Sequence, residues 1–346
     1  MPVFDQALGR LGNDIAIDLG TSNTQVLVHG RGLAVEEPSV VAVQRGNGGT
    51  QVLAVGTEAK RMVGRTPENI QAVRPIREGV IADFELAEVL LRSCVERALA
   101  GRPLVRPRMI VSVPVGTTEV ERRAIMESAR AAGGREVRLV GKSIAAALGA
   151  DLPIHDPVAS MIVDLGGGCT EIGILSMGGT VVATSVRAAG DHLDRALVAL
   201  VQQRQNILLG ERTAEEIKLR IGRATPDEAA PAQARVKGRD LSTGIPRDAV
   251  VSSEDTVTAY RPILEQIVEG IRKALSRTPP ELAADILQRG MVLCGGTSLL
   301  PGLDDYLRQA SGLPVVIAED PRRCTVIGTG ELFDDPQTLE RAAPQG

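Results

Sequence analysis

The sequence predicts an α/β protein built from two domains. Its 346 residues exceed one ordinary domain and suit two domains of roughly 150–200 residues each. Aromatic residues make up only 1% of the chain, so Val, Ile, Leu and Ala must fill the core. Apolar, β-branched runs flanked by glycine recur along the chain and are typical of buried strands in largely parallel sheets.

Strand and helix signals alternate along the first half of the chain, as in an open α/β sheet. The second predicted helix begins with a threonine cap and carries an acidic residue three positions later, which is typical of a helix start. In order, the pattern predicts a strand–turn–strand hairpin from Ile15, a helix over 80–99, a strand over 106–116, a helix over 117–133, a strand over 136–140 and a short helix over 145–150.

The opening pattern returns from residue 159 onward. At a constant offset of 146 residues, Asp18 and Gly20 meet Asp164 and Gly166, and the surrounding apolar positions match. A repeat of this length indicates a duplicated domain, each copy beginning with strand–turn–strand. A third glycine turn follows an apolar strand within 289–303. The polar region 210–255 is predicted to be a peripheral insertion outside the core.

Composition and charge exclude several classes of protein. The net charge is −4 without a basic block, and five aromatic residues offer little for nucleobase stacking, so nucleic acid is not an expected partner. The four cysteines are far apart, which argues against a zinc site and against a disulfide scaffold and favours a reducing cytoplasm. No apolar run approaches the roughly 18 residues of a membrane span.

The glycine turns predict a phosphate-binding site. Glycines let several backbone N–H groups converge on one anion. A carboxylate beside phosphate would repel it, so the paired Asp18 and Asp164 are predicted to hold a hydrated Mg²⁺ that bridges to phosphate oxygens. We therefore expect a nucleotide to bind between the two duplicated domains. No G-x-G-x-x-G opens a βαβ unit, and Glu136 stands where a P-loop ending at Ser143 would need glycine.

The chain as a whole resembles the bacterial actin homologues of the MreB type. The similarity rests on DLGTSNT, EGVIADF, VSVPVGTTEVERRAI, VDLGGGCTEIGI, TAEEIK, PPELAADILQRGMVLCGGTSLLPGLD and GLPVVIAEDP, and it covers nearly all of residues 13–330. These rod shape-determining proteins belong to the superfamily of actin, Hsp70 and sugar kinases and form filaments that guide cell-wall synthesis. The resemblance implies two lobes, each with a ribonuclease-H-like mixed sheet and a small subdomain, around an interlobe nucleotide.

The resemblance also implies domain boundaries. The expected parts are an amphipathic N-terminal segment (1–12), the core of lobe I (13–33, 68–148 and 319–346) with its small subdomain (34–67), and the core of lobe II (149–186 and 250–318) with its small subdomain (187–249).

Carried over residue by residue, the resemblance implies a site for ATP or ADP. The implied phosphate contacts are Thr21, Ser22 and Asn23 from the first lobe and Gly166, Gly167, Gly168 and Cys169 from the second. Gly190 and Asp191 would lie near the sugar, and Glu215 and Lys218 would reach the ribose and base from one helix face. The adenine side would be cradled by Gly295, Gly296, Thr297 and Ser298. An ordinary surface ion pair is the alternative for Glu215 and Lys218.

Two departures from the family pattern concern hydrolysis. Lys142 stands where the family has the glutamate that orients the attacking water, and Cys169 replaces the threonine that shares this task. A charged lysine cannot accept a proton from water, and a thiol is a poorer hydrogen-bond partner than a hydroxyl. We expect ATP binding with slow or impaired hydrolysis, with Lys142 facing the γ-phosphate as a point charge; ordinary hydrolysis remains the alternative.

Two segments are candidate membrane contacts. Phe4, Leu8 and Leu11 lie on one face of the N-terminal segment, for which a locally docked turn is the alternative. Leu104 and Val105 occupy the place of a membrane-inserting loop in the family. The expected partners are further copies of the chain, the inner face of the cytoplasmic membrane and membrane proteins of cell-wall elongation.

Two other functions remain open. The first is a hydrolysis-deficient paralogue that regulates a conventional filament by co-assembling with it. The second is a small-molecule kinase of the same superfold. A kinase needs a general base near the substrate hydroxyl, and the sequence suggests no carboxylate in the cleft besides Asp18 and Asp164.

Overall fold

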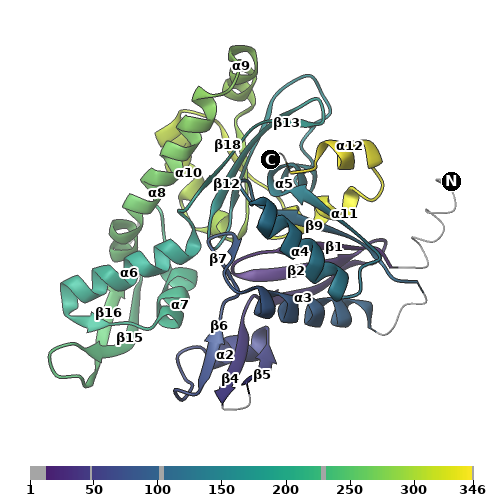
Figure 1. The fold of residues 1–346 in the computed structure, drawn as a ribbon. Helices are drawn as coiled ribbons and strands as arrows, with labels where there is room; N and C mark the ends of the chain where they lie inside the picture. Colours follow the sequence, from purple (N-terminus) through teal and green to yellow (C-terminus); the bar gives the residue numbers. More distant parts are fainter. Residues whose placement is uncertain (1–12, 47–48, 101–104, 227–230, 345–346) are drawn as a thin grey trace.

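The computed structural model describes residues 13–46, 49–100, 105–226 and 231–344. Lobe I contains a five-stranded mixed sheet in the order β10–β9–β1–β2–β3, in which β1, β9 and β10 run parallel and β1, β2 and β3 antiparallel. Helices α3 and α4 cover this sheet (Figure 1). The bounds are β1 Ile15–Leu19, β2 Asn23–Val28, β3 Gly32–Pro38, α3 Phe84–Leu99, β9 Arg108–Val113, α4 Glu119–Ala131 and β10 Glu136–Gly141.

Lobe II repeats this arrangement, as the internal repeat predicts. Its sheet has the order β13–β12–β11–β17–β18, again with an antiparallel hairpin followed by parallel strands. Asp18 pairs with Gln25 in lobe I, and Asp164 pairs with Glu171 in lobe II. The bounds are β11 Ser160–Leu165, β12 Thr170–Ser176, β13 Gly179–Val186, α8 Ser253–Ser276, α9 Pro280–Arg289, β17 Met291–Cys294, a 3₁₀ turn Gly296–Leu299, α10 Leu303–Ser311 and β18 Val315–Ile317.

Each lobe carries a smaller three-stranded sheet. In lobe I the order is β5–β4–β6, with α2 beside it; in lobe II it is β14–β15–β16, with α6 and α7 (Figure 1). The bounds are β4 Val41–Gly46, β5 Gly49–Val55, α2 Thr57–Met62, β6 Ile70–Val73, α6 Gly190–Gln205, β14 Ile207–Leu208, α7 Glu211–Ile221, β15 Gln233–Asp240 and β16 Pro246–Ser252. The expected boundary at residue 34 falls inside β3, and β6 lies beyond the expected boundary at 67.

One organisational prediction is wrong. The region 210–255 was expected to stay outside the core, but Ala214, Ile217, Ala234 and Val251 are buried in the same apolar cluster as the lobe II sheet. Charged residues such as Glu216, Lys237 and Asp248 are exposed on the opposite faces of these elements. Averaging hydropathy over the region therefore hides its alternating apolar face.

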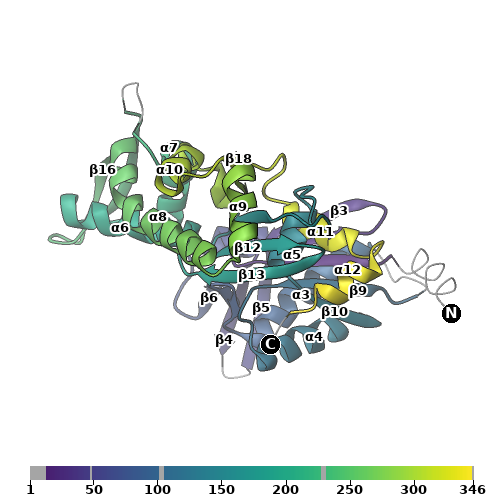
Figure 2. The same cartoon turned by 90° about the horizontal axis from the view of Figure 1, so that it is seen from above.

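Two helices lie between the lobes, α5 (Lys142–Leu148) and α11 (Cys324–Glu331). They pack on each other, α5 contacts β11 and β12, and α11 contacts β1 and β9 (Figures 1 and 2). A Cβ on Gly149 would lie 2.0 Å from the carbonyl oxygen of Cys324, and one on Gly328 would lie 1.9 Å from that of Ala145. Both glycines are therefore required for the close crossing of α5 and α11. The C-terminal helix α12 (Pro336–Arg341) follows α11.

Local signals position the elements around the cleft. Thr118 and Glu121 form the predicted capping box of α4. The predicted helix over 80–99 begins only at Phe84, capped by Asp83, because β8 (Val80–Ile81) pairs with β7 (Ile76–Arg77). Among the described helices, none combines the length and apolarity needed to cross a bilayer.

Candidate nucleotide site

A cavity of about 560 Å³ lies between the two lobes, within the range of small-molecule sites. The three glycine turns that sequence analysis singled out all line it. Sixteen of the 18 predicted site residues also line it; these residues were predicted to bind a nucleotide or a cation, or to replace the family's water-orienting residues. The sixteen are Asp18, Thr21, Ser22, Asn23, Lys142, Asp164, Gly166, Gly167, Gly168, Cys169, Gly190, Glu215, Lys218, Gly295, Gly296 and Thr297.

Two predicted residues lie elsewhere. Ser298 is fully buried behind the third turn, where its hydroxyl donates to the carbonyl oxygen of Gly295 at 2.6 Å, so it holds the turn and does not line the cavity. The carboxylate of Asp191 accepts a hydrogen bond from Arg74 at 2.9 Å, and Asp191 is not among the residues that line the cavity. A turn motif does not indicate which of its side chains point inward.

The first two phosphate turns lie against each other. A Cβ on Gly167 would be 1.9 Å from the hydroxyl oxygen of Ser22, and one on Gly168 would be 2.5 Å from that of Thr21. Thr21 in turn accepts a hydrogen bond from the backbone N–H of Gly79 at 3.0 Å. The glycines thus permit the two turns to meet, in addition to exposing backbone N–H groups toward an anion.

A buried ion pair lies at the base of the cavity. The ammonium nitrogen of Lys142 is 2.8 Å from Oδ1 of Asp18, and the same carboxylate oxygen accepts a hydrogen bond from Ser112 at 2.8 Å. Although burial alone would lower it, the pKa of Lys142 is raised above its usual value because Asp18 and Asp164 are close. Lys142 therefore remains charged throughout the physiological range.

Asp164 approaches the same point from lobe II. Its Oδ2 accepts a hydrogen bond from Thr325 at 3.2 Å, and a Cβ on Gly295 would lie 2.4 Å from its Oδ1. Burial raises the pKa of Asp164, and the positive charge of Lys142 opposes that rise. The two strand-terminal aspartates thus converge on one lysine.

Cys169 and Glu171 form a second buried group in the cavity wall. The thiol of Cys169 donates to Oε1 of Glu171 at 3.7 Å, and the backbone N–H of Val115 donates to its Oε2 at 2.9 Å. Burial raises the pKa of Cys169 to about 12, so the thiol stays protonated. Burial also raises the pKa of Glu171 to about 7, against the opposing hydrogen bond from Val115.

Gln25 occupies the place in lobe I that Glu171 has in lobe II. Both line the cavity, and each lies opposite a strand-terminal aspartate. Oε1 of Gln25 is buried without a hydrogen-bond partner among the described residues. The expectation that no carboxylate besides Asp18 and Asp164 lies in the cleft is wrong, because Glu36 and Glu171 also line it. The 146-residue offset could have identified the pair of Gln25 and Glu171, because each lies two residues after the equivalent positions Asn23 and Cys169.

Ion pairs join the lobes at the cavity mouth. Lys60 of α2 lies 2.8 Å from Glu215 of α7, so the small subdomains of the two lobes are in contact. Lys218 instead pairs with Asp194 at 2.7 Å and donates to the carbonyl oxygen of Gly190 at 3.0 Å. Glu215 and Lys218 share a cavity-facing side of α7 but are not bonded to each other.

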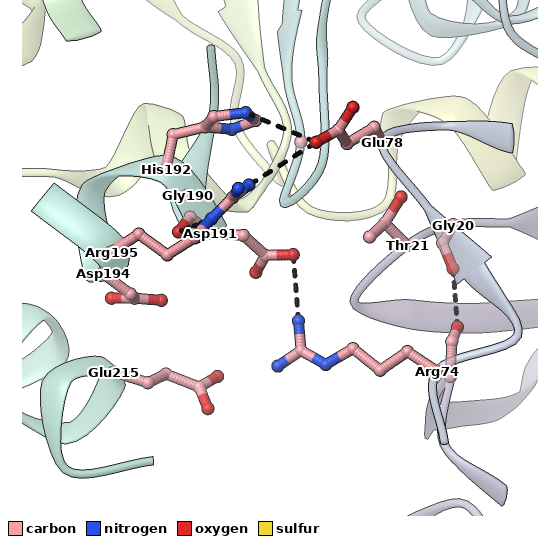
Figure 3. Close-up of polar contacts among 12 residues, drawn as sticks. Gly20, Thr21, Arg74, Glu78, Gly190, Asp191, His192, Asp194, Arg195 and Glu215 are labelled. Carbon is pink, nitrogen blue, oxygen red and sulfur yellow. Dashed lines mark hydrogen bonds and ion pairs between the residues drawn. The ribbon is translucent and has the colours of Figure 1, made fainter. Parts of the chain in front are cut away.

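A second contact joins lobe I to α6. Figure 3 shows Arg74 meeting Asp191, and Glu78 facing His192 and Arg195 at 4.0 and 3.7 Å. The Glu78 contacts are long and partly solvated, so each contributes little. Asp191 and Glu215 are predicted site residues and Glu78 lies in the EGVIADF segment, but the sequence does not indicate their partners across the cleft. These partners are Lys60, Arg74, His192 and Arg195.

An apolar wall closes one side of the cavity. It is formed by Leu193, Leu219, Leu299, Leu300 and Pro301. Leu219 is 77% exposed and Leu299 53% exposed, which is unusual for leucines that border a polar turn. Such a wall suits the face of a heterocyclic base. In the sequence, the only indication of this wall is Leu219, which directly follows the predicted site residue Lys218.

A side chain of the protein lies beside the predicted cation site, and most of the predicted membrane contacts lie outside the described residues. No cluster of three or more metal-ligating side chains is found among the described residues, and a Mg²⁺ ion does not fit beside Asp18 because the Lys142 ammonium already lies there. Of the predicted membrane residues, Phe4, Leu8, Leu11 and Leu104 lie outside the described residues. Val105 is half-buried.

Comparisons with known proteins agree with this geometry. The profile of the family described as MreB/Mbl protein matches residues 12–341. The chain is 46% identical to the cell shape-determining protein MreB of Escherichia coli K12 over 331 residues, covering 94% of each chain, and 43% identical to Mbl of Bacillus subtilis, covering 95% of this chain and 98% of the other. MreB5 of Spiroplasma citri bound to AMPPNP superposes with a TM-score of 0.87 at 34% identity, covering 93% and 96% of the two chains.

The raised pKa of Glu171 predicts a pH-dependent stability. A carboxyl whose pKa is higher in the folded state stabilises that state below pH 4.5, and this contribution is lost as the pH rises through about 7. Glu171→Gln removes the loss, so between pH 4.5 and 8 the free energy of unfolding of the variant should rise by about 3 kcal/mol relative to the wild type. Urea unfolding without nucleotide measures it.

The exposed Glu216→Gln is the matched control and should follow the wild type at every pH. Parallel pH profiles of wild type and Glu171→Gln would mean that Glu171 is ionised in the folded protein at pH 5.

Proposed function

The chain belongs to the MreB/Mbl family of cell shape-determining actin homologues, and from this premise we propose that it binds ATP or ADP in the interlobe cleft and polymerises into filaments. The observation that carries the proposal is the convergence of two equivalent phosphate turns, one from each lobe, on one cavity. Structures of the Spiroplasma citri relative were determined with AMPPNP and with ADP, which supports the same ligand class here.

The cavity offers a separate contact for each part of a nucleotide. Backbone N–H groups of the turns at Gly20–Asn23 and Gly166–Cys169 would hold the phosphates. Glu215 and Lys218 would reach the ribose, and Leu219 and Leu299 would cover the base. The chain's own residues thus orient the ligand at both ends.

A nucleotide held in this way couples the two lobes. The phosphates would touch turns of both lobes, so binding favours the closed arrangement in which the mouth contacts such as Lys60 to Glu215 are formed. Closure changes the outline of the subunit and hence its fit to the next subunit. The filament would be the product, and the nucleotide its regulator.

Hydrolysis is proposed to be slow or impaired. The Lys142 ammonium is paired with Asp18 and cannot take a proton from water. The Cys169 thiol remains protonated and is directed at Glu171. Neither residue can orient a water molecule by accepting its hydrogen bond, as a carboxylate and a hydroxyl would.

These same substitutions favour a second role. A family member that binds ATP but hydrolyses it slowly would stabilise filaments of a conventional relative by co-assembly. The small-molecule kinase alternative loses its support, because the chain belongs to the cell shape-determining family and Glu171 already accepts two hydrogen bonds.

Membrane association is part of the proposal. The N-terminal segment and the loop containing Leu104 and Val105 would contact the inner face of the cytoplasmic membrane, and membrane proteins of cell-wall elongation would be further partners. Each anchor is small, but subunits joined in a filament bind the surface together, so their contributions accumulate.

Filament formation with ATP tests the central proposal. Electron microscopy of the purified chain should show straight or paired protofilaments with ATP and few or none without nucleotide. Gly167→Ala should weaken ATP binding about tenfold or more and abolish the filaments, because its Cβ would collide with Ser22.

Gly179→Ala is the matched control, since its Cβ would have only a carbonyl oxygen at 3.9 Å as a neighbour. A wild-type chain that binds ATP without ever forming filaments would favour the regulatory role, whereas a chain that binds no nucleotide would refute the proposal.

Hydrolysis is tested by restoring the family's residues. The double variant Lys142→Glu with Cys169→Thr should release phosphate from ATP at least about tenfold faster than the wild type, because both water-orienting acceptors return. The measurement is continuous phosphate release at equal nucleotide occupancy. Equal rates for wild type and double variant would contradict impaired hydrolysis.

Membrane binding is tested by flotation with liposomes of anionic lipid. The wild type should float, and a chain that lacks residues 2–11 and carries Leu104→Ser and Val105→Ser should remain in the dense fraction. The deletion alone and the two serine substitutions alone should each reduce binding relative to the wild type. Unchanged flotation of the combined variant would show that other residues contact lipid.

A further inference from the structure

A positive charge that belongs to the chain itself lies beside the two aspartates of the cleft. The Lys142 ammonium is 2.8 Å from Asp18 and close enough to Asp164 to oppose the rise of its pKa. Its side chain is 11% exposed, and it lines the cavity beside both phosphate turns. A cation bridging two aspartates and a phosphate would have to lie at this same point.

One oxygen of each carboxylate is already engaged. Oδ1 of Asp18 is shared by Lys142 and Ser112, and Oδ2 of Asp164 accepts from Thr325. Mg²⁺ requires near-octahedral oxygen ligation at about 2.0–2.1 Å. The Lys142 ammonium beside Asp18 competes for this carboxylate and repels a second cation. The residues present therefore suit a monovalent, hydrogen-bonding cation.

The position of Lys142 in its helix makes the pairing necessary. Lys142 is the first residue of α5, where the helix dipole disfavours a positive charge. Burial adds a further cost. The aspartates offset both costs, and the lysine keeps its proton as a result. The charge is thus a fixed part of the site.

We propose that the Lys142 ammonium takes the place of a divalent cation, so that the cleft binds a nucleoside triphosphate free of metal. An ammonium group has three N–H donors. One is directed at Asp18, which leaves two to donate to phosphate oxygens at the turns. This inference rests on the proposed nucleotide function and adds that its ligand is the metal-free form.

The proposal explains why one substitution affects both binding and chemistry. A lysine at 142 removes the acceptor that would orient water and at the same time supplies the positive charge that holds the phosphates. The cleft remains a binding site while losing the means to activate water. Lys60 and Lys218 add further positive charge at the mouth, each paired with a carboxylate.

The test compares ATP binding with and without metal. Calorimetric titration of the full chain is carried out in excess Mg²⁺ and in excess EDTA. For the wild type the two dissociation constants should agree within about twofold. Lys142→Glu should bind ATP about 10- to 100-fold more weakly in EDTA than in Mg²⁺, because three carboxyl groups then meet the phosphates without a cation.

Two further variants keep the result interpretable. Lys142→Met has a similar length without charge and should also lose affinity in EDTA, which separates the charge from the shape of the side chain. Lys273→Glu makes the same charge change on the exposed side of α8 and should behave as the wild type. Thermal unfolding of each variant establishes that it is folded.

The outcomes separate the two proposals. Wild-type binding that requires Mg²⁺ overturns the lysine assignment but leaves the nucleotide function intact. Metal-independent binding by both the wild type and Lys142→Glu likewise overturns the role of Lys142. No binding of ATP under either condition overturns the nucleotide function and, with it, this inference.

Discussion

Two like charges held face to face at the centre of the molecule constrain the rest of the structure. Asp18 and Asp164 end equivalent strands of the duplicated lobes, so the internal symmetry brings their carboxylates together. Such a pair is stable only with a positive charge between its members. Lys142 supplies it, and because it begins α5, the electrostatic centre lies at one end of the helix layer that joins the lobes.

That helix layer is also the steric centre of the molecule. The crossing of α5 and α11 is close enough that Gly149 and Gly328 have no room for a side chain. Packing of this kind has few alternative arrangements, since displacement of either helix would create collisions or cavities. The lobes are thus attached rigidly near the base of the cleft, while the mouth is joined by the weaker, partly solvated pairs of Lys60 and Arg74.

The duplicated copies differ where chemistry is concerned. Gln25 and Glu171 occupy equivalent places, yet one is neutral and the other a carboxyl whose pKa is raised to about 7. The turn that carries Asn23 in lobe I carries Cys169 in lobe II, directed at Glu171. The backbone of the two turns is thus repeated between the lobes, whereas the side chains that they present to the cavity differ.

Local pattern alone determined much of this protein. Strand-terminal aspartates, glycine turns and their 146-residue offset predicted two copies of one fold facing a shared cavity, which the structure confirms. The capping box that begins with Thr118 could also be predicted directly. Only the tertiary structure decided that Lys142 pairs with Asp18, that Glu215 meets Lys60 and not Lys218, that Ser298 points away from the cavity, and that the polar region 210–255 is anchored in the core. The periodicity of a sequence depends on residues that are close along the chain. The partner of a charged side chain instead depends on which distant segments are brought into contact when the lobes pack together.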